Sequence, residues 1–87
     1  MPFVYVLRCR DGSLYTGATK DLDRRVAQHV SGRASRYTRS RLPVTLVWSR
    51  LLRTWPAALR LELRIKALPR VDKHALVNGV LSLPRRR

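Results

Sequence analysis

The stretch that decides the fold is FVYVLRCRDGSLYTGA, residues 3–18. Its first part, residues 3–7, is rich in β-branched and aromatic side chains, which favour a strand. The Asp11-Gly12 pair is a typical hairpin turn signal, and residues 14–18 have the composition of a returning strand. The chain is therefore predicted to begin with an antiparallel hairpin.

The length of the hairpin loop determines where the two tyrosines of this stretch point. With a two-residue loop, Asp11-Gly12, Tyr5 and Tyr15 would lie on opposite faces, because side chains alternate along a strand. A three-residue loop over residues 10–12, with Gly12 in the left-handed region, would pair Leu7 with Tyr15 and put both tyrosines on one face. Gly12 permits the second geometry.

A helix and then a basic loop are predicted after the hairpin. Asp21 is a good N-cap, apolar residues follow at every fourth position, and Gly32 is a typical C-terminal glycine. Residues 33–41 contain four arginines and no acidic residue. This segment is therefore the best candidate for holding a nucleic-acid strand.

The second half of the chain predicts one strand and two helices. Residues 44–48 are rich in strand formers. Thr54 can cap a helix that runs to about Leu68, and a shorter helix is predicted over residues 71–77. The order β-β-α-β-α-α indicates an α/β fold of the α+β type, a small sheet flanked by helices. We expect a single domain over residues 1–80 and a basic C-terminal tail over residues 81–87.

The composition narrows the class of function. The chain has 87 residues and a formal net charge of +14, which indicates a polyanionic partner, most simply nucleic acid. Its 45% hydrophobic content is that of a globular domain. No apolar run could span a membrane and no signal peptide is evident, so we expect a cytoplasmic protein. Cys9 is the only cysteine, which excludes an intrachain disulfide and a cysteine-rich zinc site.

Glu62 is the only glutamate, and it lies beside an apolar stripe on the second predicted helix. The ordinary interpretation is an i,i+4 ion pair with Lys66 on the helix surface. The alternative is a carboxylate that binds a hard divalent cation. Both remain open from the sequence.

Arg25 and His29 are spaced i,i+4, so they lie one above the other on the first helix. They can be an ordinary surface pair. If that face lines a groove, Arg25 can bind a phosphate while His29 accepts or donates a proton. His74 is interpreted as a surface residue, and Cys9 as a small hydrophobe and not a nucleophile.

The combination of Phe3-Val4-Tyr5, Tyr15-Thr16-Gly17, Arg25 with His29, and Glu62 resembles the GIY-YIG endonuclease family, and within it the small stand-alone YhbQ-like bacterial branch. The similarity runs from about residue 3 to residue 77. It includes the segments LYTGATKDLDRRVAQH, RYTRSRLPVTLVW and ALRLELRIKAL. The resemblance implies a three-stranded antiparallel sheet with helices packed about it.

The resemblance also implies the roles of five catalytic residues. Tyr5 and Tyr15 match the motif tyrosines, and Tyr5 would take the proton of the attacking water. Arg25 matches the arginine at the scissile phosphate, and His29 would orient or deprotonate Tyr5. Glu62 matches the metal-binding carboxylate, which would hold one Mg²⁺ or Mn²⁺. Because tyrosine ordinarily has a pKa near 10, we expect neighbouring cations to lower the pKa of Tyr5.

The residues expected to contact nucleic acid are Gly17, where a missing side chain permits close approach, together with the basic loop and one later lysine: Arg33, Arg36, Tyr37, Arg39, Arg41 and Lys73. Tyr37 is expected to stack on a base. The chain departs from the family at Phe3, where the motif has glycine, and around Lys73 and His74, where many members carry an asparagine.

Three functions are compatible with these residues. The first is a metal-dependent DNA endonuclease with little sequence specificity, acting in DNA repair or recombination, with any preference for nicked or branched DNA left open. The second is a DNA- or RNA-binding module whose chemistry is weak or lost. The third, a small basic ribosome-associated protein, rests on size and charge alone.

Overall fold

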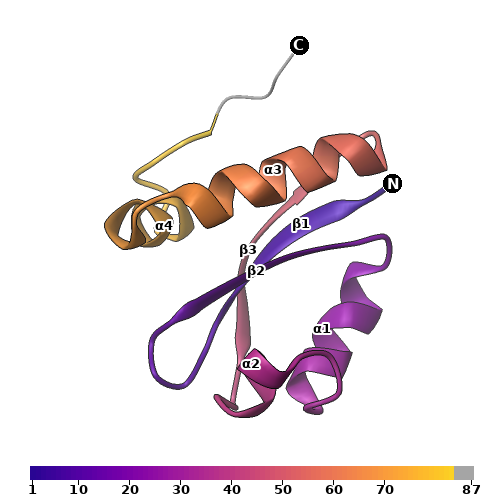
Figure 1. Cartoon of the computed structure of the whole chain (residues 1–87), viewed down its shortest axis with the longest axis vertical. Helices are drawn as coiled ribbons and strands as arrows, with labels where there is room; N and C mark the ends of the chain where they lie inside the picture. Colours follow the sequence, from indigo (N-terminus) through magenta and orange to yellow (C-terminus); the bar gives the residue numbers. More distant parts are fainter. Residues whose placement is uncertain (84–87) are drawn as a thin grey trace.

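The computed structural model describes residues 1–83, and it confirms the predicted class and order of elements with one addition. The elements, drawn in Figure 1, are β1 (Phe3–Arg8), β2 (Leu14–Thr19), α1 (Leu22–Val30), α2 (Arg36–Arg39), β3 (Thr45–Leu51), α3 (Trp55–Ala67) and α4 (Arg70–Val77). The added element is the short helix α2. Residues 84–87 of the predicted tail lie outside the described residues.

The hairpin has the three-residue loop that brings both tyrosines to one face. Leu7 is paired with Tyr15 and Tyr5 with Gly17 across the β1–β2 ladder. Gly12 has a φ of 83°, a left-handed conformation that glycine adopts without a steric penalty. The two-residue alternative is therefore wrong for this chain.

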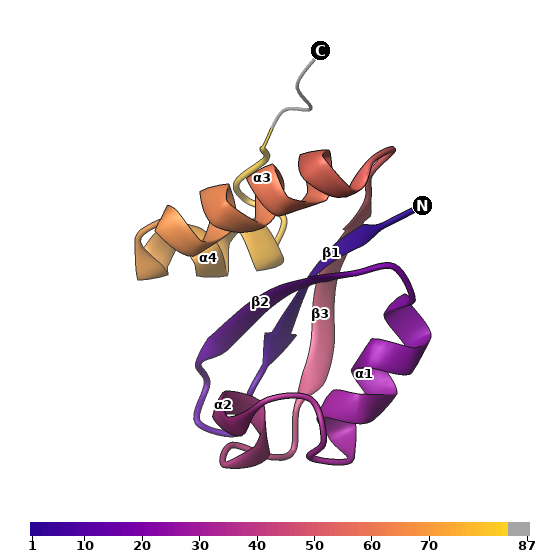
Figure 2. The ribbon, with the colours of Figure 1, turned by 45° about the vertical axis from the view of Figure 1, so that its right-hand side comes forward.

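The sheet separates two layers of helices. Its strand order is β2-β1-β3, antiparallel throughout, so the central strand β1 is paired along both edges. In Figures 1 and 2, α3 and α4 lie on one side of the sheet and α1 and α2 on the other. Alternate residues of β1 belong to two hydrophobic cores on opposite faces of the sheet. On one face, Val4 and Val6 pack against residues of α3, namely Ala58, Leu61 and Ile65. On the other face, Val44 packs with the remaining β1-side residues Tyr5, Leu7 and Cys9.

Local capping explains where the longer helices begin and end. The Asp21 side chain accepts a hydrogen bond from the Arg24 N–H, and Thr54 accepts one from Ala57, as their N-cap positions predict. Gly32 and Gly79 follow α1 and α4 in the left-handed conformation. These predicted helix boundaries are confirmed to within one or two residues.

Two predicted segments differ from the structure. Residues 33–41 are not a continuous loop, because Ser35 accepts a hydrogen bond from the Thr38 N–H and caps α2. A four-residue helix has too few turns to show an apolar period, so no sequence pattern predicts it. The third strand begins at Thr45 and continues to Leu51, because it pairs along the whole of β1 up to Phe3.

Across residues 1–83, no helix has the length and apolar character that crossing a membrane requires.

Candidate active site

The centre of the site is a hydrogen bond between Tyr5 of β1 and His29 of α1. The Tyr5 hydroxyl lies 2.8 Å from His29 Nε2, and the two side chains are only 2% and 1% exposed. The rings meet edge to face, with centroids 5.6 Å apart. The structure thus brings together a phenol and an imidazole that are 24 residues apart in sequence.

Thr38 orients His29, a role that was not predicted from the sequence. Its hydroxyl is fully buried, 2.9 Å from His29 Nδ1 and 3.0 Å from the Ser35 hydroxyl. When Thr38 donates its proton to Ser35, it accepts the Nδ1–H of His29, which leaves Nε2 to accept the proton of Tyr5. The only signal in the sequence is the serine three residues before Thr38, which predicts a cap but not this contact.

The pKa shifts of Tyr5 and His29 set which of the two holds the proton before any reaction. Burial raises the pKa of Tyr5, the neighbouring Tyr15 and Glu62 raise it further, and Arg25 opposes them. Burial lowers the pKa of His29, and Arg25 lowers it further. Arg25 therefore acts on Tyr5 as expected, but burial outweighs it, so the expectation of a lowered tyrosine pKa is wrong for this structure. Near neutral pH the pair is a phenol and a neutral imidazole.

Gly17 is required by the position of Tyr5. The Tyr5 ring lies over Gly17, and a Cβ added there would be 2.5 Å from Cζ of that ring. The space that the missing side chain leaves is therefore filled by Tyr5 itself. Contact of Gly17 with nucleic acid stays a prediction.

We predict that Gly17→Ala destabilises the fold by about 1–3 kcal/mol, the usual cost of overpacking a core. It should also displace the Tyr5 ring from His29. Urea denaturation of the wild type and the variant measures the stability.

The control for this prediction is the same change with the ring removed. In a Tyr5→Ala background, Gly17→Ala should cost far less, since the clashing atoms are gone. An equal cost in both backgrounds would show that the Tyr5 ring is not the reason for the glycine.

Arg25 and Glu62 complete the site from the two helical layers. Arg25 lies on α1, one turn before His29, and its charge acts on both Tyr5 and His29. Glu62 comes from α3 on the other side of the sheet, and its charge also acts on Tyr5. Each of the other four predicted catalytic residues thus touches Tyr5 or His29 or acts electrostatically on Tyr5, although nothing in the sequence pattern alone shows that the two layers are linked there.

Glu62 also makes the ordinary contact that the sequence predicts. Its carboxylate is 2.8 Å from the Lys66 ammonium, and its side chain is 16% exposed. Among residues 1–83 no group of three His, Cys, Asp or Glu side chains is placed to bind a metal. A single carboxylate suits Mg²⁺ or Mn²⁺, which take their other ligands from water and phosphate, and does not suit a structural zinc.

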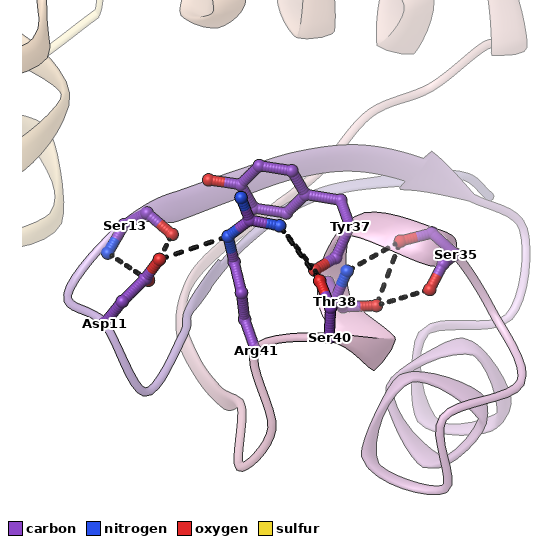
Figure 3. A network of polar contacts seen from close by, with 7 residues as sticks. All are labelled: Asp11, Ser13, Ser35, Tyr37, Thr38, Ser40 and Arg41. Carbon is purple, nitrogen blue, oxygen red and sulfur yellow. Dashed lines mark hydrogen bonds and ion pairs between the residues drawn. The ribbon is translucent and has the colours of Figure 1, made fainter.

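A row of aromatic rings leads from the site to α2. The Tyr15 ring centroid is 5.0 Å from that of His29 and 5.8 Å from that of Tyr37. On Tyr37, the Arg41 guanidinium carbon lies 3.8 Å from the ring centre, as Figure 3 shows. One face of Tyr37 is therefore covered, which restricts the base stacking predicted for it.

The four arginines of residues 33–41 differ in their contacts: one forms an ion pair, and three are exposed without one in the described part of the chain. Arg41 Nε donates to Asp11 at 3.1 Å, which fastens the β1–β2 loop to the end of α2 (Figure 3). Arg33, Arg36 and Arg39 are exposed and make no ion pair with any residue from 1 to 83. These three are the cations of the segment best placed to bind phosphate.

Cys9 belongs to the core beside Leu7. Burial raises the pKa of its thiol, which disfavours the reactive thiolate. The interpretation of Cys9 as a small hydrophobe therefore agrees with its position.

A buried tyrosine–histidine pair on the central strand, with an arginine and a lone carboxylate acting on the tyrosine, is the arrangement of a nuclease-type domain. The GIY-YIG catalytic domain family matches residues 1–74, and the chain belongs to this family.

Its similar relatives are UPF0213 proteins. One from Halobacterium salinarum is 49% identical over 87% of this chain and 99% of its own length. One from Vibrio cholerae is 48% identical over 90% of this chain and 78% of its own length. The solution NMR structure of a UPF0213 protein from Bacillus halodurans has a TM-score of 0.60 and 44% identity, covering 91% of this chain and 85% of that one. The predicted resemblance is confirmed, and since relatives occur in archaea, the branch is not only bacterial.

Proposed function

We propose that the protein is a metal-dependent endonuclease that hydrolyses DNA phosphodiester bonds with little sequence specificity, in DNA repair or recombination. The observation that carries the proposal is the buried hydrogen bond between Tyr5 and His29, with the charges of Arg25 and Glu62 acting on the same tyrosine. Membership of the GIY-YIG family supports an endonuclease-type activity.

In the proposed mechanism Tyr5 transfers protons and is not a standing tyrosinate. The oxygen of the attacking water forms a bond to phosphorus, and the bond to the leaving oxygen breaks, after which that oxygen takes a proton from solvent. The proton of the water passes to the Tyr5 oxygen while the Tyr5 proton passes to His29 Nε2, 2.8 Å away. The raised pKa of Tyr5 and the lowered pKa of His29 keep both residues uncharged before the reaction, and they oppose an isolated transfer between the two, so the Tyr5 proton leaves only as the proton of the water arrives.

Arg25 and Glu62 would act on the charge of the reacting phosphate. The Arg25 guanidinium can donate two parallel hydrogen bonds to phosphate oxygens and neutralise charge that develops in the transition state. A Mg²⁺ or Mn²⁺ ion at the Glu62 carboxylate would supply Lewis-acid stabilisation of the phosphate and leaving oxygen. Lys66, which is paired with one oxygen of the same carboxylate, would compete with the ion for Glu62.

Phosphate contacts would supply most of the affinity for DNA. The net charge of +14 and the three exposed arginines of the basic segment, Arg33, Arg36 and Arg39, suit backbone contacts that carry little sequence information. Binding should weaken steeply as salt is raised.

The direct test is cleavage of supercoiled plasmid and of branched oligonucleotides at low salt. Addition of Mg²⁺ or Mn²⁺ should produce nicked and linear products, and EDTA should stop the reaction. Intact substrate with either metal at every enzyme concentration would contradict the proposal.

A second candidate is a nucleic-acid-binding module without chemistry. The observation that favours it is the ion pair between Glu62 and Lys66, because the carboxylate already has a cationic partner. This alternative predicts that the protein shifts DNA or RNA in a gel under the same conditions in which it leaves both uncut.

A further inference from the structure

A cleft of about 250 Å³ lies next to the site, between the start of β2 and the first turns of α4. Ser13 and Leu14 line it from the hairpin, Tyr37 lines it from α2, and three basic side chains line it from α4: Arg70, Lys73 and His74. Residues from three separate parts of the chain thus form one hollow, and none of them belongs to the Tyr5–His29 pair.

The charge of the cleft is positive. Arg70 and Lys73 are one helical turn apart, so both face the same side of α4. Neither makes an ion pair within the part of the chain that the structure describes. Two acids lie near the cleft in the described part of the chain. Asp11 is already paired with Arg41 and accepts hydrogen bonds from Ser13. Asp72 lies on α4 between Arg70 and Lys73 but is not among the residues that line the cleft.

The cleft also offers a neutral donor, the Tyr37 hydroxyl, and is continuous with the site. Tyr37 points its hydroxyl away from α2, towards the side of the hairpin that carries Ser13 (Figure 3). The same ring is 5.8 Å from the Tyr15 ring, which in turn is 5.0 Å from His29. A strand that lies at the Tyr5–His29 pair can therefore continue past Tyr15 and Tyr37 into the cleft.

The volume of the cleft is large enough for one group of a nucleic-acid strand but not for a whole nucleotide chain. Pockets that enclose a drug-sized molecule measure roughly 300–1,000 Å³. A hollow of about 250 Å³ is smaller and open, with room for a phosphate and part of its sugar. Two cations and the Tyr37 hydroxyl form a donor set suited to a phosphate oxyanion, since the Ser13 hydroxyl already donates to Asp11.

We propose that this cleft is a second phosphate-binding subsite, in which Arg70 and Lys73 bind one phosphate group of the nucleic-acid strand away from the bond that is cleaved. The placement along a cleaved strand rests on the proposed function, whereas the binding of phosphate does not. The subsite would position the strand on the α4 side of the domain, while the exposed arginines of residues 33–39 bind it elsewhere.

The first experiment maps binding without cleavage. The ¹⁵N-labelled protein is titrated in EDTA with tetrathymidylate, once with a 5′-phosphate and once without. Amide shifts at Ser13, Tyr37, Arg70 and Lys73 with both oligonucleotides identify an internal phosphate as the ligand, and shifts with the phosphorylated one alone identify a terminal phosphate. Either result supports the subsite. If the amide signals of these four residues shift with neither oligonucleotide, the proposal is overturned.

The second experiment compares two double variants of equal charge loss. For Arg70→Ala/Lys73→Ala, the plot of the logarithm of oligonucleotide affinity against that of salt concentration should be shallower by about 0.7 for each single-strand phosphate that the variant no longer neutralises. The control, Arg53→Ala/Arg60→Ala, removes two exposed cations that do not line the cleft and should keep the slope of the wild type. Equal slopes for the two double variants contradict the proposal.

The two proposals fail separately. If the expected amide shifts and salt slopes are observed but DNA is never cut, the subsite is supported and the nuclease function is contradicted. If the wild type cuts DNA but the Arg70→Ala/Lys73→Ala variant binds the oligonucleotide like the control variant, the nuclease function is supported and the subsite is contradicted.

Discussion

Tyr5→Phe is expected to reduce the rate of DNA cleavage by about 10²–10⁴-fold, the usual contribution of general acid–base catalysis. The change removes the hydroxyl that links the attacking water to His29 Nε2, while the ring still fills the space over Gly17. Loss of the buried hydrogen bond should cost about 1–3 kcal/mol of stability, because Nε2 is left without a partner. Single-turnover cleavage and urea denaturation measure the two effects.

The matched control is Tyr37→Phe, which removes a hydroxyl from the same row of rings but not from His29. At protein concentrations that saturate the DNA, it should leave the rate of the chemical step within a few-fold of the wild type, because Tyr37 can affect binding but does not contact the Tyr5 hydroxyl or His29 Nε2. A Tyr5→Phe enzyme as active as Tyr37→Phe would contradict the role of Tyr5.

The pH profile gives an independent check of the same pair. The pKa of His29 lies below its ordinary value of 6.5, so the imidazole is neutral and able to accept a proton at pH 7. As the pH falls below 6.5 and through the pKa of folded His29, the rate of cleavage should decline, because a protonated imidazole cannot accept the Tyr5 proton. Stability should decline over the same range, since the unfolded chain binds the proton more readily.

Glu62→Gln is expected to reduce metal-stimulated cleavage to the level measured in EDTA. Glutamine keeps the size of the side chain but has no charge with which to hold Mg²⁺ or Mn²⁺. The fold should persist, because the lost pair with Lys66 is partly exposed, and such pairs contribute about 0.2–1 kcal/mol. Cleavage assays over a range of Mg²⁺ and Mn²⁺ concentrations, with circular dichroism of the variant, measure both.

The control for Glu62 is Lys66→Gln, which breaks the same ion pair but keeps the carboxylate. It should retain cleavage and reach half-maximal activity at a lower metal concentration, since no ammonium competes for the carboxylate. Equal loss in the two variants would assign the effect to the ion pair and would remove the argument for metal at Glu62.

The fold followed from local signals because each element carries its own. The strand formers of residues 3–7, the Asp21 and Thr54 caps and the left-handed glycines act over a few residues, and the structure confirms what they predict. The four-residue helix α2 was not predicted because it depends on one Ser35 hydrogen bond and has no repeating apolar face.

The candidate site was predicted unevenly. Tyr5, Tyr15, Arg25, His29 and Glu62 could be named from motif spacing and family resemblance, and the structure gathers them about Tyr5. Thr38 could not be named, because its role comes from a contact with His29 across the turn between two helices. Nor could Arg41 be separated from the other arginines of its segment, since its partner Asp11 lies 30 residues away.

By itself, the sequence determined the class of fold and the cationic character of the chain, whereas the structure decided which hairpin loop forms and therefore that the two tyrosines share a face. Only the tertiary structure decided which form of the chemistry these residues can carry out. The pKa of Tyr5 rises and that of His29 falls because both side chains are buried between the sheet and α1. Desolvation depends on the surroundings of a side chain in three dimensions, so a highly cationic sequence folded around a tyrosine that keeps its proton.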